Sequence, residues 1–158
     1  MKIEFTNVKQ PDGSKICAIC VASMITHRTV DELIEEFGCD YTSQYHAYWS
    51  ERRLRICLAT YDWVHGAVCY SLEPTRFTAG LRIEFPDRWD NFPCLLVVES
   101  KKLKLKDGTP ANHIILYDHN HKKIRDSSSR EEFTDLADYM VIEFIPLQKI
   151  LPYEGAEL

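Results

Sequence analysis

The sequence feature that most constrains the fold is an apolar run without a polar face, residues 18–25 (AICVASMI). A helix that is apolar on every side is buried on every side. Alanine and methionine favour helix over strand, and the polar, turn-rich segment at residues 9–15 (KQPDGSK) gives the helix a start near Cys17. The sequence therefore predicts a central helix that the rest of the chain must cover.

Length and composition fit one globular domain over residues 1–158. A chain of 158 residues can bury about two thirds of its unfolded surface. Hydrophobic residues make up 45% of the chain and charged residues 27%, which excludes a disordered polymer. No apolar run reaches the ~18 residues of a membrane span, and the N-terminus lacks the apolar core of a signal peptide. We therefore expect a cytoplasmic protein without membrane contact, with a loose tail at residues 151–158.

Local signals divide the chain into a helical first half and a second half of strands. Thr29 and Glu32 form a T-x-x-E capping box for a second helix, which Gly38 ends. A third helix is predicted from about residue 43 to residue 54. Runs rich in β-branched and aromatic residues predict strands at 92–100, 111–119, 122–128 and 138–147, with weaker candidates at 67–72 and 81–85. This order indicates an α+β fold with a helix layer packed on one antiparallel sheet.

Several conspicuous features have a structural interpretation. The net charge of −5 argues against broad nucleic-acid binding, which needs a basic surface. The basic run at residues 101–106 (KKLKLK) is predicted to be a solvated loop between strands, and the alternative is a docking patch for an acidic partner. Trp49, Trp63 and Trp89 are expected to pack in the core rather than line a cleft.

The six cysteines occur in a chain without a secretion signal, so we expect reduced thiols. Cys17 lies where the polar turn meets the buried helix. A helix start lowers the pKa of a thiol, because its unpaired N–H groups and dipole favour negative charge. Cys20 lies one turn further in, among apolar neighbours where a thiolate would be costly. The sequence thus separates a candidate nucleophile, Cys17, from packing residues, namely Cys20, Cys39, Cys57, Cys69 and Cys94.

A thiolate nucleophile needs a base, and local context favours His113 among the six histidines. His113 follows a polar loop at the head of a predicted apolar strand, which would hold its ring rigidly. Asp126 ends the next strand, where a carboxylate could orient an imidazole on the neighbouring antiparallel strand. Nucleophile, base and orienting group together follow the logic of the serine triad, transferred to cysteine. His119 and His121 fall in a turn and are predicted to be solvated.

The order of these residues resembles the papain-like cysteine peptidases of the bacteriocin-processing (double-glycine) type, including stand-alone phage and bacterial relatives. The resemblance rests on Gln10, on Cys17 opening CAICVASMI, and on PCLLVV, HIILYD and IRDSSS, and it spans residues 10–146. It implies a papain-like fold whose central helix begins at the nucleophile, Cys17. It also implies that Gln10 and the Cys17 backbone N–H bind the oxyanion, that His113 is the general base and that Asp126 orients it. The expected function is a cysteine peptidase or amidase that acts on a peptide or protein substrate through a thioester, without cofactor or metal.

The residues leave alternatives open. Ile16 and Ala18 flank Cys17 where the family usually has a polar or small residue and glycine, and Ser127 stands where proline is common. A degenerate site that binds a partner without cutting is therefore one alternative. The spacing of Cys17, Cys20 and two of the later histidines also permits a zinc site, and CAIC could be a redox dithiol. The same cysteine, histidine and aspartate could pass the acyl group to a nucleophile other than water.

Overall fold

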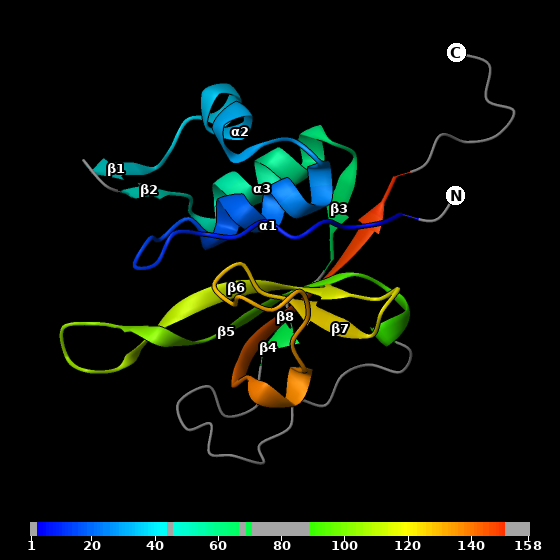
Figure 1. Ribbon diagram of the computed structural model, residues 1–158. Coiled ribbons are helices and arrows are strands. Elements are labelled where there is room, and N and C mark those ends of the chain that lie inside the picture. Colours follow the sequence, from blue (N-terminus) through cyan, green and yellow to red (C-terminus); the bar gives the residue numbers. More distant parts are fainter. Residues whose placement is uncertain (1–2, 44–45, 67–68, 71–88, 151–158) are drawn as a thin grey trace, which may run out of the picture.

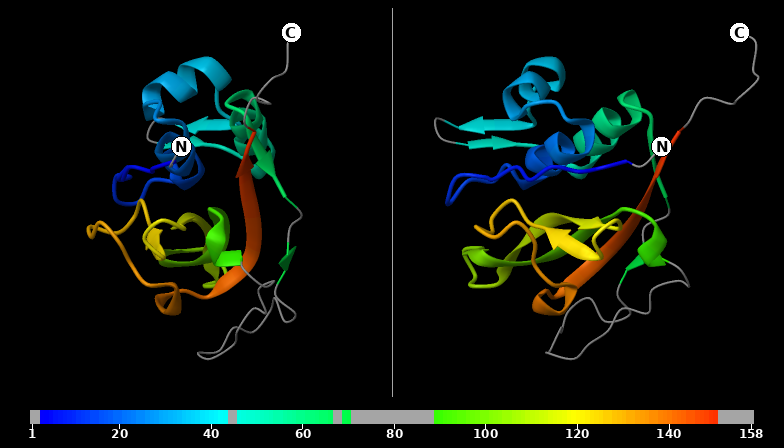
Figure 2. Two further views of the ribbon diagram at one scale, coloured as in Figure 1. Left: turned by 90° about the vertical axis from the view of Figure 1, so that its right-hand side faces the viewer. Right: turned by 45° about the vertical axis from the view of Figure 1, so that its right-hand side comes forward.

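The computed structural model describes residues 3–43, 46–66, 69–70 and 89–150 of the chain. In this part, helices α1 (Cys17–Thr26), α2 (Val30–Phe37) and α3 (Glu51–Thr60) form a layer over one face of an antiparallel sheet (Figure 1). Figure 2 shows the same separation of helices and sheet from two further sides. The α+β class predicted from the sequence is confirmed in this general form.

The main sheet has the strand order β3-β8-β5-β6-β7, and β4 also pairs with β8. The pairings within it are antiparallel. The four principal strand predictions correspond to four of its strands, with the register placing His113 opposite Val98. The strand bounds are β3 (Trp63–His65), β4 (Cys69–Tyr70), β5 (Cys94–Lys104), β6 (Pro110–Asp118), β7 (Lys123–Arg125) and β8 (Val141–Lys149).

Alternating side chains of the central strands pack in two hydrophobic clusters, one on each face of the sheet. On the helix side, Leu95 and Val97 of β5 pack in one cluster with α1. On the other side, Leu96 and Val98 of β5 pack in a second cluster with Tyr139. Residues 18–25 of α1 are all buried, as their composition predicts. Helix α1 is therefore packed between the sheet and the other helices, and this packing fixes the position of its first residue, Cys17.

Helix α2 begins and ends where its sequence signals place it. The Thr29 side chain accepts a hydrogen bond from the Glu32 N–H at 3.1 Å. Gly38 follows the last helical residue with φ +71°, a conformation that favours glycine, and its N–H bonds to the Ile34 carbonyl. The Glu32 carboxylate forms an ion pair with Arg28 at 2.9 Å.

The predicted third helix is wrong in its position. Residues 41–43 and 46–48 form the strands β1 (Tyr41–Ser43) and β2 (His46–Tyr48), which pair with each other, and α3 begins only at Glu51. Residues 41–48 contain three tyrosines and one threonine, residue types that favour strands. Ser50 caps the helix by accepting the Arg53 N–H at 3.3 Å. The buried Trp49 ring, which donates from Nε1 to the Gly38 carbonyl at 2.7 Å, anchors the chain just before that cap.

The basic run is also placed differently from its prediction. Strand β5 continues through Lys104, so most of the run is the exposed end of a strand, and only its last residues lie in a turn. Trp49 and Trp63 are buried, as predicted. Cys20, Cys57 and Cys94 are buried as well, and the five cysteines that the structure describes form no disulfide.

Some sequence predictions fall on residues outside the described part of the chain. These are the strand candidate at 81–85, the tail at 151–158, and the side chains of Cys69 and Trp89; of the candidate at 67–72, only β4 is described. Within the described residues, no helix is both long and apolar enough to cross a membrane.

Candidate active site

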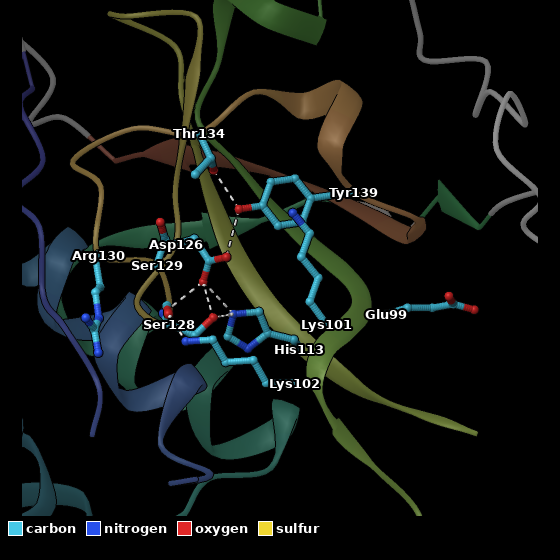
Figure 3. Close-up of a pocket in the computed structure, with 10 residues that line it drawn as sticks. All are labelled: Glu99, Lys101, Lys102, His113, Asp126, Ser128, Ser129, Arg130, Thr134 and Tyr139. Atoms are coloured by element: carbon cyan, nitrogen blue, oxygen red, sulfur yellow. Dashed lines mark hydrogen bonds and ion pairs between the residues drawn. The ribbon is translucent and has the colours of Figure 1, made fainter. Parts of the chain in front are cut away.

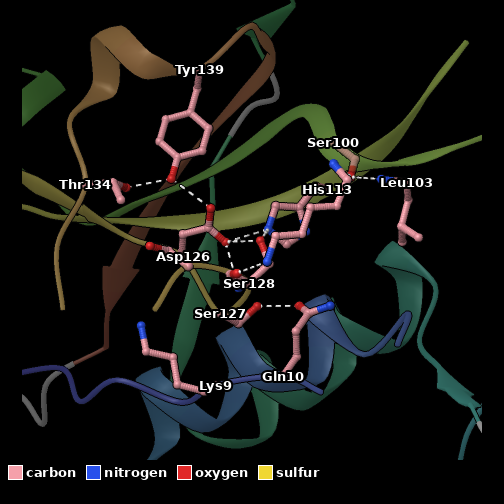
Figure 4. Close-up of polar contacts among 12 residues, drawn as sticks. Lys9, Gln10, Ser100, Leu103, His113, Asp126, Ser127, Ser128, Thr134 and Tyr139 are labelled. Atoms are coloured by element: carbon pink, nitrogen blue, oxygen red, sulfur yellow. Dashed lines mark hydrogen bonds and ion pairs between the residues drawn. The ribbon is translucent and has the colours of Figure 1, made fainter. Parts of the chain in front are cut away.

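Three segments that are far apart in the sequence meet at the start of α1. The first is the loop that carries Gln10 and leads into Cys17, the second is the beginning of β6 with His113, and the third is the loop after β7 with Asp126 and Ser127. Figure 4 shows side chains of these segments joined by hydrogen bonds, with Gln10 near the helix and Asp126 beside the His113 ring. All four residues singled out from the sequence therefore belong to one region of the structure.

His113 and Asp126 form a buried pair. The His113 Nε2 and the Asp126 Oδ1 lie 2.7 Å apart, and both residues are buried. Burial alone lowers the pKa of the imidazole, but hydrogen bonds to Asp126 and to Cys17, together with their charges, outweigh it and raise the pKa to about 9. Because Nε2 faces Asp126, the other ring nitrogen is left for the thiol. His113 is thus oriented by a carboxylate on one side and faces Cys17 on the other.

The Asp126 carboxylate is held by more donors than the sequence indicates. It accepts bonds from the Ser128 N–H and the Ser128 hydroxyl, both at 2.9 Å, and from the Tyr139 hydroxyl at 2.7 Å. Burial raises the pKa of the carboxyl, but the bond and charge of His113, followed by the Tyr139 and Ser128 donors, hold it well below its usual range. Since the Tyr139 proton points to Asp126, the Thr134 hydroxyl donates to Tyr139 at 2.6 Å. Asp126 therefore stays ionised and fixed.

Tyr139 and Thr134 could not have been found from the sequence, because nothing local marks them. Tyr139 lies inside a segment that was predicted only as a strand, and it precedes β8. Ser128 did have a signal, since an aspartate followed by serines often accepts a backbone N–H two residues on. That turn is present, and the same Asp126 oxygen also serves His113.

The Cys17 sulfur sits at an uncapped helix start. The N-cap residue, Ile16, forms no side-chain cap bond, so the first-turn N–H groups remain available to other acceptors. Burial raises the pKa of the Cys17 thiol, but the hydrogen bond and charge of His113 and the N–H groups of Ile114 and Ala18 outweigh it, and the pKa is lowered. Strand β7 pairs with residues Leu116 to Asp118 of β6 and does not reach Ile114. The Ile114 backbone N–H is therefore available to the Cys17 thiol.

Gln10 is fixed by contacts to both neighbouring loops. Its Oε1 accepts the Ser127 hydroxyl at 2.5 Å, and its backbone N–H donates to the Ser127 carbonyl at 2.8 Å. Its Nε2 donates to the Ser14 carbonyl at 3.0 Å and lies 3.4 Å from the Ser14 hydroxyl oxygen, so the shorter bond uses one of the two amide hydrogens. Gln10 and His113 both line a small cleft of about 20 Å³, enough for one oxygen-sized group. Ser127 therefore orients the Gln10 amide.

Cys20 differs from Cys17 in its surroundings. Burial raises the pKa of its thiol to about 12, the charge of Cys17 adds to this, and a hydrogen bond to Ser127 opposes it. Within the described residues, no group of three or more histidine, cysteine, aspartate or glutamate side chains is arranged to hold a metal ion. Residues 3–16, which precede α1, contain no strand, unlike the βαβ setting of a thioredoxin dithiol. The geometry supports a packing role for Cys20.

The two turn histidines, His119 and His121, differ in how far their side chains are exposed. The His121 side chain is 46% exposed and lies 3.1 Å from the Asp118 carboxylate, which agrees with the prediction for this residue. His119 is half-buried, and its ring packs edge-on against Phe5, so the prediction that it is solvated is wrong. Neither ring is among the partners of the Cys17 thiol or of Asp126.

Comparisons with known proteins do not assign the site to a family. The sequence matches no model of a protein family and no curated protein. The functional argument therefore rests on the side chains themselves.

Proposed function

We propose that the protein is a small cysteine peptidase or amidase of the papain-like type, which cleaves a peptide or protein substrate through a thioester intermediate. The observation that carries the proposal is the hydrogen-bonded chain from Cys17 through His113 to Asp126. In it the pKa of the thiol is lowered while that of the imidazole is raised to about 9, so a thiolate–imidazolium pair is favoured. The thiols of Cys20 and Cys57, which pack in the core, have pKa values raised to about 12 instead.

In the acylation step, the Cys17 thiolate attacks the substrate carbonyl carbon and a carbon–sulfur bond forms. The carbonyl oxygen takes up the negative charge, and the Cys17 backbone N–H and the second hydrogen of the Gln10 amide are its proposed donors. The His113 imidazolium then gives its proton to the leaving nitrogen as the carbon–nitrogen bond breaks. The products of this step are a free amine and a thioester on Cys17.

In the deacylation step, a water molecule replaces the amine. Neutral His113 takes one proton from the water, the hydroxide adds to the thioester carbonyl, and the carbon–sulfur bond breaks to return the thiolate. Asp126 does not exchange protons in this scheme. Asp126 stabilises the imidazolium and holds the ring in place. The bonds that Asp126 accepts from Ser128 and Tyr139 support this role.

A peptide digest tests the proposal. The purified full-length protein is incubated with a defined pool of tetradecapeptides that contains every pair of neighbouring residues, and the products are identified by mass spectrometry. We expect cleavage products from the wild type, none from Cys17→Ala, and a covalent acyl adduct on Cys17 that hydroxylamine releases. If the Cys17→Ala variant cleaves the same bonds as the wild type, or if no product and no adduct form, the proposal is wrong.

A further inference from the structure

Beside the His113–Asp126 pair lies a cavity that the proposed mechanism does not use. Its volume is about 290 Å³, close to the lower limit for ligand pockets, which suits one side chain of a substrate. Its walls come from the end of β5, from the loop after β7 and from Tyr139. Figure 3 shows the cavity with Arg130 on one side and Lys101 on the other.

The cavity is basic, although the protein as a whole carries a net charge of −5. Lys101, Lys102 and Arg130 supply cations to its walls, and Glu99 is the acidic wall residue besides Asp126. The Asp126 carboxylate is already satisfied by His113, Ser128 and Tyr139. In Figure 3, the Glu99 side chain points away from His113. An anion placed in this cavity therefore meets positive charge and no free carboxylate close to the base.

The cations are held in different ways. The Lys101 ammonium lies over the Tyr139 ring, 4.2 Å from its centre. The Lys102 ammonium donates to the Ser128 carbonyl at 2.7 Å and lies 3.6 Å from the Asp12 carboxylate. Arg130 is exposed at the mouth and forms no ion pair with any residue in the described part of the chain. A guanidinium offers a planar pair of donors that matches a carboxylate. The hydroxyl of Ser129, another wall residue, adds a neutral donor.

The position of the cavity indicates which part of a substrate it receives. His113 lines both the cavity and the small cleft, whereas Gln10 lines only the small cleft. In the proposed mechanism, the oxyanion faces Gln10 and the leaving nitrogen faces His113, which gives it a proton. The residue that follows the scissile bond is therefore the one next to the cavity.

We propose that this cavity is a subsite for a carboxylate on the leaving-group side of the scissile bond. The inference rests on the proposed peptidase function and adds the substrate class: peptides with an acidic residue just after the cleaved bond, or with their own C-terminal carboxylate there. Arg130 is the main ligand of the carboxylate, with Lys101 as the second cation.

The test uses the same tetradecapeptide pool and a matched pool in which every Asp and Glu is replaced by Asn and Gln. We expect cleavage sites of the wild type to be enriched in Asp or Glu after the scissile bond. For the best site, we expect Arg130→Gln to reduce the preference for Glu over Gln, measured as a ratio of kcat/KM values, by about tenfold, as expected for loss of a charge-assisted bond. Lys104→Gln, which removes an exposed lysine of β5 outside the cavity, is the matched control and should leave the ratio unchanged. A ratio near one in the wild type, or an equal ratio in Arg130→Gln, overturns the subsite.

A binding measurement separates this inference from the peptidase proposal. Isotope-labelled full-length Cys17→Ala protein is titrated with three probes and followed by NMR: acetyl-Ala-Glu-Ala-amide, acetyl-Ala-Gln-Ala-amide and acetyl-Ala-Gln-Ala with a free carboxylate. We expect the two anionic probes, but not the neutral one, to shift the Arg130 side-chain signal, and the stronger of the two identifies the source of the carboxylate. Charge-dependent binding without any cleavage in the digest would support the subsite and contradict the peptidase. Cleavage without a charge preference would support the peptidase proposal and contradict the subsite. The two proposals can therefore fail separately.

Discussion

Strands β6 and β7 carry two buried carboxylate–cation pairs that look alike. Asp118 at the end of β6 binds Arg125 of β7, and His113 near the start of β6 binds Asp126 just after β7. Both pairs are joined at 2.7 Å, and the side chains of all four residues are less than a tenth exposed. Distance and burial therefore do not distinguish them.

The partners that remain for each cation do distinguish them. A guanidinium group does not lose its proton at ordinary pH. The Arg125 guanidinium lies over the Phe133 ring at 4.4 Å, and its partner Asp118 also binds His121. His113 can gain and lose a proton, and its second ring nitrogen is left for the Cys17 thiol. A buried ion pair thus becomes chemically useful when its cation titrates and keeps one position for a nucleophile.

The largest expected effect is on activity. We expect His113→Ala to lower kcat/KM on a peptide cleaved from the pool by about 10³-fold, because it removes the general acid and base. Arg125→Met should leave kcat/KM of the folded fraction close to the wild-type value. Steady-state kinetics, with the folded fraction determined by circular dichroism, checks both variants. An equal loss of activity in the two variants would erase the distinction between the pairs.

The order of effects reverses for stability. We expect Arg125→Met to lower the free energy of unfolding by about 3 kcal/mol, because it leaves the Asp118 charge buried without its cation. His113→Ala should cost less, since Asp126 keeps its bonds from Ser128 and Tyr139. Urea unfolding measures both values, and adding Asp118→Asn to Arg125→Met should restore most of the loss. A larger cost for His113→Ala would show that its pair is the structural one.

Tyr139 should act as a positioning residue for Asp126. We expect Tyr139→Phe to lower kcat by about tenfold, a change of about 1.4 kcal/mol in the barrier, while KM stays unchanged. The physical reason is that the carboxylate loses one of the donors that fix it against His113. Thr134→Val, which removes only the donor to the Tyr139 hydroxyl, should have a smaller effect in the same direction. A change in KM with kcat retained would show that the Tyr139 hydroxyl contributes to substrate binding rather than to the position of Asp126.

The smallest effect is expected at Cys20. Cys20→Ala should lower the free energy of unfolding by about 1 kcal/mol, through a small cavity and the lost bond to Ser127. Its kcat/KM should equal that of the wild type, and the protein should contain no zinc with or without the substitution. Loss of activity in Cys20→Ala, or one equivalent of zinc that is lost with it, would favour the dithiol or zinc alternative.

The parts of the structure that the sequence predicts are those with a local cause. The burial of α1 follows from its unbroken apolar run, and the start of α2 follows from the Thr29 cap. The order of Cys17, His113 and Asp126 indicated a shared site because each residue borders an element that the pattern predicts. The position of α3 could not be found in this way, since Trp49 reaches back to Gly38 and fixes where the helix begins.

The parts that the sequence does not predict depend on contacts between distant residues. Ser127 and Gln10 are separated by 117 positions, and only the fold brings the hydroxyl to the amide. Tyr139 meets Asp126 because the segment before β8 returns beneath the sheet, and no local pattern records that return. The basic cavity likewise combines residues of β5 with a loop that follows β7.

The central claim, that His113 activates Cys17 as a thiolate, is tested most directly by the pH dependence of Cys17 alkylation. Native protein is treated with limiting iodoacetamide from about pH 5 to about pH 10, a range that brackets the ordinary pKa of a thiol. The alkylation of each cysteine is quantified by mass spectrometry, with Cys20, Cys57 and Cys94 as internal references. Because the pKa of the Cys17 thiol is lowered and that of His113 is raised to about 9, the thiolate should already be present near neutral pH.

We expect Cys17 to react first among the thiols, at a rate that is high at neutral pH and changes again as His113 loses its proton near pH 9. In His113→Ala, burial without the imidazolium raises the thiol pKa, so the neutral-pH rate should fall by about a hundredfold and recover only in alkali. If wild-type Cys17 reacts no faster than the core thiols, or if His113→Ala leaves its rate and pH profile unchanged, the account of the site is wrong.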